Sequence, residues 1–339
     1  MHNRKYELDM MRIVACIMVV ILHTAASGWN LEPTSIEWKY FNFADMMVRG
    51  GVPLFFMISG ALFINRETID VKMLLYHNVM HLCKVFIMWS LFYVIVIDQL
   101  QIRRYSSKRA LLAGVIRGYD HLWFLPVMIF VYFFIPIVHS CIHEQKIKIK
   151  YLLLLFAVAL LKENIMLIPN VSDIAVALVS KIDYYCIQYL GYMVLGAGLS
   201  RIEFSRRTGN ISIGVYFAIS AISAYANRWY AVVINEGIAS EWLYGNFALP
   251  VVIQATCIFI FFQSLKNKKV RFAGVLAELS ECTLGIYLLH PYIINRLPVS
   301  TSDFHPLISI PYIFILVFVI SFITIFMFRR IPIIKKILL

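Results

Sequence analysis

Charged residues are scarce in this chain: 15% of its 339 residues are Asp, Glu, Lys or Arg, whereas soluble domains have about 25%. Hydrophobic residues make up 61%, and the mean hydropathy is +0.77. Long polar stretches are also missing, so no segment between apolar runs has the length of a folded soluble domain. These shortages exclude a soluble globular protein. They predict one membrane domain over residues 1–339, without an appended soluble domain.

Cysteines at metal-binding or redox spacing are absent. The six cysteines lie singly in or beside apolar stretches, with no CxxC pattern, and we interpret them as apolar packing residues. Two histidine pairs, His77/His81 and His139/His143, have the four-residue spacing that can place two imidazoles on one metal ion, but no carboxylate motif accompanies either pair. We therefore expect no metal site and no permanently bound cofactor.

Long apolar runs fill most of the chain. A membrane-spanning helix needs about 20 mainly apolar residues, and this rule predicts ten of them, at 8–27, 46–64, 79–97, 122–141, 151–168, 182–199, 211–227, 247–264, 274–295 and 307–328. The run at 151–168 is the weakest, because Lys162 and Glu163 interrupt it; we expect both at its outer end. The predicted fold class is an all-α polytopic bundle.

The basic residues predict the topology. The net charge is +12, and most Lys and Arg residues lie at the two ends and in every second loop, as the positive-inside rule requires if both termini are cytoplasmic. Because these loops are short, we expect no nucleic-acid partner. The loop 98–121 is the exception, with five basic residues on the outer side. It is either a helix lying on anionic headgroups or a surface that gathers an anionic glycan, and both interpretations stay open.

The first apolar run carries a polar face. Asp9 and Arg12 are three residues apart and so adjacent on a helix, and His23 follows about three turns later on nearly the same side. Each charge held in hydrocarbon costs about 2.5–3.5 kcal/mol, which favours an ion pair facing a cavity. The alternative is that Asp9 and Arg12 are interfacial anchors and that His23 bonds a neighbouring helix. Since the charges interrupt the run, we expect a retained helix and not a cleaved signal.

Four stretches resemble one known family. "LDMMRIVACIMVVILHT" is similar to the first helix of the membrane acyltransferase 3 family, in which Arg is followed by ten residues and then His. "RGGVPLFFMISGALF" resembles its second helix, "HLWFLPVMIF" the start of its fourth, and "LGIYLLHPYII" a late helix with Tyr and His. The resemblance runs from about residue 6 to the last span. It is strongest to the stand-alone members that O-acetylate surface polysaccharides, such as enterobacterial common antigen.

The resemblance implies an O-acyltransferase of the bacterial inner membrane with His23, Arg12 and Asp9 as catalytic residues. Acetyl-CoA would be the donor, and a cell-surface polysaccharide or its lipid-linked precursor the acceptor. Arg12, paired with Asp9, would hold the donor at the cytoplasmic side. His23 would deprotonate the acceptor hydroxyl or carry the acyl group briefly.

The same resemblance implies a set of donor- or acceptor-binding residues: Arg49, Ser59, Lys84, His121, Trp123, Tyr287 and His290. On the residues alone, Arg49 is equally typical of a snorkelling anchor, and His121 and Trp123 are typical of headgroup anchors. Many members carry paired arginines at the start of the third helix to hold the donor. Here only Lys84 is a basic equivalent.

Two other functions stay open on the residues alone. Buried charge pairs with a histidine also describe proton-coupled transporters. A helper of glycan export or polymerisation, without chemistry of its own, has the same composition.

Overall fold

The computed structural model describes residues 4–98, 108–143, 148–166, 185–266, 268, 270–332 and 334, and these are helical or irregular throughout. A helix occupies each of the ten predicted apolar ranges. Six helical segments are long and apolar enough to cross a membrane, which confirms an all-helical, multi-pass membrane protein. The count of ten spans and the side of the membrane on which the termini lie stay predictions.

The principal helices are α1 (Tyr6–Ala25), α2 (Ile36–Val48), α3 (Gly51–Phe63), α5 (Met80–Phe92), α6 (Lys108–Arg117), α7 (Phe124–His143), α8 (Ile149–Met166), α10 (Tyr185–Leu199), α11 (Arg206–Trp229), α12 (Leu249–Gln263), α13 (Ala273–Ile294) and α14 (Pro306–Arg330).

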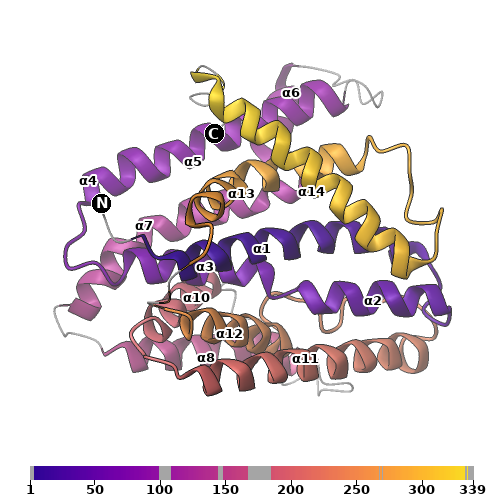
Figure 1. Cartoon of the computed structure of the whole chain (residues 1–339), viewed down its shortest axis with the longest axis horizontal. Coiled ribbons are helices and arrows are strands. Elements are labelled where there is room, and N and C mark those ends of the chain that lie inside the picture. The colour runs from indigo at the N-terminus through magenta and orange to yellow at the C-terminus, as the bar shows by residue number, and fades with distance from the viewer. Residues whose placement is uncertain are drawn as a thin grey trace.

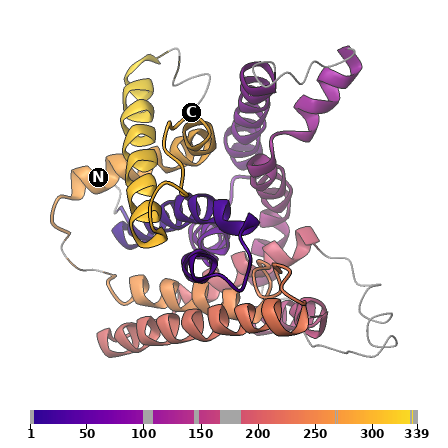
Figure 2. The same cartoon turned by 90° about the vertical axis from the view of Figure 1, so that its right-hand side faces the viewer.

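Helix α1 lies at the centre of the molecule. It packs against α13, α3, α2, α14 and α12. Figure 2 shows three groups of helices around α1 and α3: α13 with α14, α5 with α7, and α11 with α12. In Figure 1 the yellow α14 crosses one side of α1, while α11 and α12 lie on the opposite side. Of the polar face of the first apolar run, Asp9 is buried, and Arg12 and His23 are partly exposed.

The segment 28–45 is not the loop that the hydropathy predicts, because it contains α2. The side chain of Ser35 caps this helix by accepting a hydrogen bond from the Trp38 backbone N–H at 3.1 Å, a common N-cap arrangement. Asn42 is buried and donates to the Ala224 carbonyl of α11 at 2.8 Å. A helix that meets its neighbour through polar residues lacks the apolar content of a span, so sequence pattern misses it.

Glycines set the spacing of the helices nearest to α1. The helix breaks at Arg49 and Gly50, between α2 and α3. A Cβ on Gly51 would lie 2.9 Å from the Cβ of Met18, on α1. The glycines here permit a close approach of α3 to α1.

Helices α3 and α10 cross at a second pair of glycines. A Cβ on Gly60 would overlap the backbone of Met193, and a Cβ on Gly196 would overlap the backbone of Met57. The two backbones therefore touch, and α3 is fixed against α10 on the side away from α1. This contact holds Ser59, the neighbour of Gly60, in place.

The basic loop 98–121 contains α6, and residues 99–107 of it lie outside the described part. Val115 of α6 is buried, whereas Leu112 and Ile116 are 59% and 67% exposed. Arg109 and Arg117 are exposed on the same helix. A short helix that shows both apolar and basic side chains to its surroundings has the character of a membrane-surface helix.

Candidate functional site

Three histidines from distant parts of the chain meet beside the end of α1. The ring of His23 lies 5.0 Å from that of His290 on α13, and the ring of His121, just before α7, lies 5.9 Å from that of His290. His290 is fully buried and His121 is 4% exposed. The structure thus brings together one residue predicted to be catalytic and two predicted to bind substrate.

The hydrogen bonds of His290 and His121 define which ring nitrogens are free. Nδ1 of His290 lies 3.2 Å from the Ile286 carbonyl, and Nε2 of His121 lies 3.4 Å from the Leu288 carbonyl. A carbonyl only accepts, so these nitrogens carry the protons. The other two, Nε2 of His290 and Nδ1 of His121, are buried and have no hydrogen-bond partner among the residues that the structure describes. Both neutral rings therefore keep an unused lone pair that can accept from a hydroxyl group.

Two tyrosines hold this histidine cluster. The hydroxyl of Tyr287 donates to the backbone carbonyl of His121, and that of Tyr93 donates to the Leu288 carbonyl at 2.7 Å. The rings of both tyrosines contact the His121 ring, with centroids 5.8 and 4.8 Å away. Sequence reasoning missed Tyr93, because a Tyr near the end of a span is typical of the membrane interface.

At the other end of α1, Asp9 accepts hydrogen bonds from two arginines. Its Oδ1 lies 3.3 Å from Nη1 of Arg12, and its Oδ2 lies 2.6 Å from Nε of Arg4. Ser280 of α13 donates to Oδ1 at 2.7 Å. The predicted Asp9–Arg12 pair is confirmed, but Arg4 is the nearer partner, and sequence reasoning missed it. The hydrogen bond to Asp9 raises the pKa of Arg4 above its usual value.

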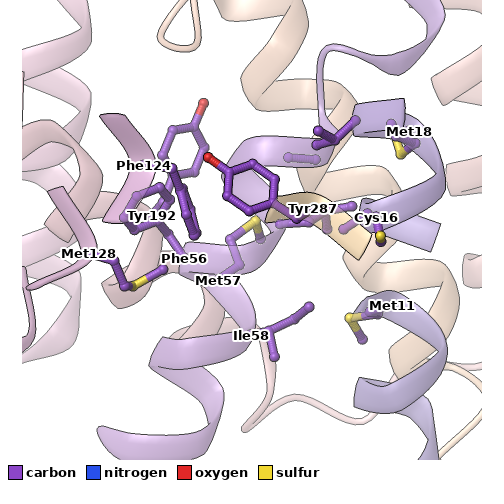
Figure 3. Packing of buried hydrophobic residues seen from close by; sticks show 14 of the residues in the cluster. Met11, Cys16, Met18, Phe56, Met57, Ile58, Phe124, Met128, Tyr192 and Tyr287 are labelled. Atoms are coloured by element: carbon purple, nitrogen blue, oxygen red, sulfur yellow. The ribbon is translucent and has the colours of Figure 1, made fainter. Parts of the chain in front are cut away.

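A cavity of about 280 Å³ runs between these two ends, along α1 and α13. Arg12 lines it near the charged end, and Tyr287 lines it next to the histidine cluster. Between them the walls are mostly apolar, with Ser59 and Tyr132 as a polar pair whose oxygens lie 3.3 Å apart. Figure 3 shows Tyr287 beside Phe124; Ile58 and Met128, also labelled there, line the same cavity. A long, thin ligand with one charged end suits this shape.

The remaining predicted residues lie outside the cavity. Lys84 is exposed and does not line it; Asn78 and Leu82, from the same region of the chain, do. Trp123 is partly buried against Tyr189, with ring centroids 5.8 Å apart. The binding roles of Lys84 and Trp123 stay predictions.

Arg49 belongs to a separate buried ion pair. Its Nη2 lies 2.6 Å from Oδ2 of Asp45, and its guanidinium sits 4.2 Å above the ring of Tyr244. Asp45 is 1% exposed. The pair connects the end of α2 to the segment before α12, which indicates a structural anchor. The predicted binding role of Arg49 stays a prediction.

The two histidine pairs with four-residue spacing have different surroundings. The rings of His139 and His143 stack 4.1 Å apart, and their Nε2 atoms lie 2.8 and 3.2 Å from the carbonyls of Arg66 and Ile64. These hydrogen bonds connect α7 to the end of α3. In the other pair, His77 is exposed. In the described part of the chain, no three His, Cys, Asp or Glu residues are arranged to hold a metal ion.

The family model described as an acyltransferase domain, acyltransferase 3, matches residues 5–330. This chain belongs to the acyltransferase 3 family. No curated protein and no solved structure matches it. The acyltransferase 3 domain covers nearly the whole chain, so the molecule is a multi-pass membrane acyltransferase. No observation favours the transporter alternative.

Proposed function

We propose that this acyltransferase moves an acetyl group from acetyl-CoA to a hydroxyl of a cell-surface glycan or its lipid-linked precursor. We place it in the bacterial inner membrane, acting in the manner of the members that modify enterobacterial common antigen. One observation carries the proposal: a largely apolar cavity has a cationic end at Arg12 and, past its other end, three histidines, of which His290 and His121 keep unused acceptor nitrogens.

The charged end of the cavity suits an acyl-CoA donor. Arg4 takes the nearer contact with Asp9, so the Arg12 guanidinium keeps donor groups for a ligand. A guanidinium binds phosphate oxygens through paired hydrogen bonds. The apolar walls beyond Arg12 accommodate the uncharged arm that carries the thioester, and this arm directs the acyl group toward Tyr287.

The histidine end supplies the chemistry. His23 removes the proton of the acceptor hydroxyl, and the hydroxyl oxygen attacks the thioester carbonyl carbon. The carbon–sulfur bond then breaks, and CoA leaves as a thiol after His23 returns the proton. In the other order, a nitrogen of His23 attacks the thioester carbonyl carbon, the carbon–sulfur bond breaks and CoA leaves as the thiolate. The acceptor hydroxyl oxygen then attacks the acyl carbon, the bond to His23 breaks, and the hydroxyl proton ends on the CoA sulfur. Both orders give an ester and free CoA, and the lone pairs of His290 and His121 orient the hydroxyl.

Structural analysis of the host glycan tests the proposed function. Glycan from the wild type, a gene deletion and a His23→Ala strain is compared by NMR, with the amount of membrane protein checked by immunoblot. We expect O-acyl signals in the wild type and their loss in the other two strains, at unchanged chain length. Normal acylation in the His23→Ala strain, or an unmodified wild-type glycan, would overturn it.

A further inference from the structure

A second pocket, of about 300 Å³, lies at the end of α1 that is far from Arg12. Its polar lining comes from Thr24 and Ser27 at the end of α1 and from Ser300, Thr301 and Asp303 in the segment before α14. It shares no lining residue with the cavity that contains Arg12. The molecule therefore has a separate space on this side.

Helix register places this pocket directly beyond the histidines. Ser27 follows His23 by four residues and lies in the 3-10 turn Ala26–Asn30 directly after α1, and Ile294 follows His290 by four residues and is the last residue of α13, so each lies about one turn further out. Both residues line the pocket. His23 and His290, whose rings are in contact, thus lie between the Arg12 cavity and this second pocket.

The chemistry of the pocket suits a polyol. Hydroxyl groups both donate and accept hydrogen bonds, and a carboxylate accepts them. Oδ2 of Asp303 accepts from the Ser300 backbone N–H at 2.8 Å, which orients the carboxylate. The side chains of Ser27 and Thr301 are joined at 2.6 Å, so the two walls are linked. Among the residues described, no Lys or Arg lines this pocket, which argues against a phosphate ligand.

We propose that this pocket binds a sugar unit of the hydroxyl-bearing acceptor. The assignment rests on the proposed function, because it places the acceptor opposite the acyl donor with His23 between them. A volume of about 300 Å³ is at the low end of the range for small-molecule pockets, ~300–1,000 Å³. It accommodates a single sugar, from which the rest of a glycan extends outward.

Acceptor kinetics test this assignment. The purified full chain in nanodiscs receives acetyl-CoA and alkali-treated, lipid-linked glycan from the deletion strain, or the same glycan released from its lipid by mild acid. Thr301→Trp fills the pocket, and Asp303→Asn removes the charge at constant shape. Ser302→Trp is the matched control, because Ser302 is exposed and does not line the pocket.

We expect Thr301→Trp and Asp303→Asn to raise the acceptor KM about tenfold, as the loss of a charged hydrogen bond does. The KM for acetyl-CoA should stay within about twofold, and Ser302→Trp should behave as wild type. Asp303→Asn keeps the test valid if Thr301→Trp does not fold. The increase in the acceptor KM must appear with both glycans, because the proposed contacts are made to sugar hydroxyls and not to lipid.

Three results would overturn the assignment: an unchanged acceptor KM in Asp303→Asn, an equal rise in the KM for acetyl-CoA, or a rise confined to the lipid-linked glycan. These outcomes leave the proposed function standing, because the wild type still transfers acetyl groups. A wild-type chain that transfers none to either glycan would instead defeat the proposed function, and the pocket assignment with it.

Discussion

The ring of His23 lies 5.0 Å from the ring of His290. This contact joins α1 to α13, the helix that also supplies Ser280 to Asp9 at the opposite end of α1. The same two helices therefore carry the charged end of the cavity and the histidine cluster. We infer that their mutual position sets the distance between donor and acceptor.

His290 is expected to act as a positioning residue for the acceptor hydroxyl. His290→Phe keeps a ring of similar size but removes both ring nitrogens, and with them the lone pair that can accept from a hydroxyl. We expect kcat to fall at least about tenfold, since general acid–base catalysis is typically worth ~10²–10⁴ and positioning supplies part of it. The measurement is steady-state acetyl transfer, with the melting temperature as a control for folding. Unchanged kcat in a folded variant would rule out this role.

Arg12 and Arg4 provide a matched comparison at the donor end. Both pair with Asp9, but only Arg12 lines the cavity. We expect Arg12→Ala to raise the KM for acetyl-CoA at least about tenfold, because a charged hydrogen bond is worth roughly 1.5–3 kcal/mol. Arg4→Ala should change this KM by less than about threefold. Equal effects of the two substitutions would show that Arg12 acts only through its ion pair.

The crossing of α3 and α10 requires glycine. A methyl group at Gly60 or Gly196 would overlap the opposite backbone, whereas nothing lies within 4 Å of a Cβ at Gly214 in α11. We expect Gly60→Ala and Gly196→Ala to destabilise the protein by about 1–3 kcal/mol, the usual cost of overpacking. Gly214→Ala should be neutral or stabilising. Thermal unfolding in detergent measures all three, and a stable Gly60→Ala would contradict the close backbone contact.

Arg49 is expected to contribute to stability through Asp45. Arg49→Ala leaves the carboxylate of Asp45 buried without its partner, which typically costs about 3–5 kcal/mol. The double variant Arg49→Gln with Asp45→Asn removes both charges and should recover much of that loss. Thermal unfolding and acceptor KM are measured together. A stable Arg49→Ala with a raised acceptor KM would instead support the acceptor-binding role that the family resemblance implies.

Hydropathy alone located the apolar helices, because the apolar content of a span is a local property of the sequence. It missed α2, whose buried Asn42 is satisfied by the distant carbonyl of Ala224. The Asp9–Arg12 pair was predictable from its three-residue spacing. The partners Arg4 and Ser280 were not, since no helix periodicity links them to Asp9. His121, Tyr287 and His290 were found only through the family resemblance, because they meet His23 through tertiary structure.

The most direct test of the central claim is acetyl transfer by purified protein in nanodiscs, with wild type compared with His23→Ala and His23→Gln. If His23 performs the chemistry, kcat falls at least about a hundredfold, while the KM for acetyl-CoA stays near the wild-type value because Arg12 is intact. Transfer by folded His23→Ala at the wild-type rate would contradict the account.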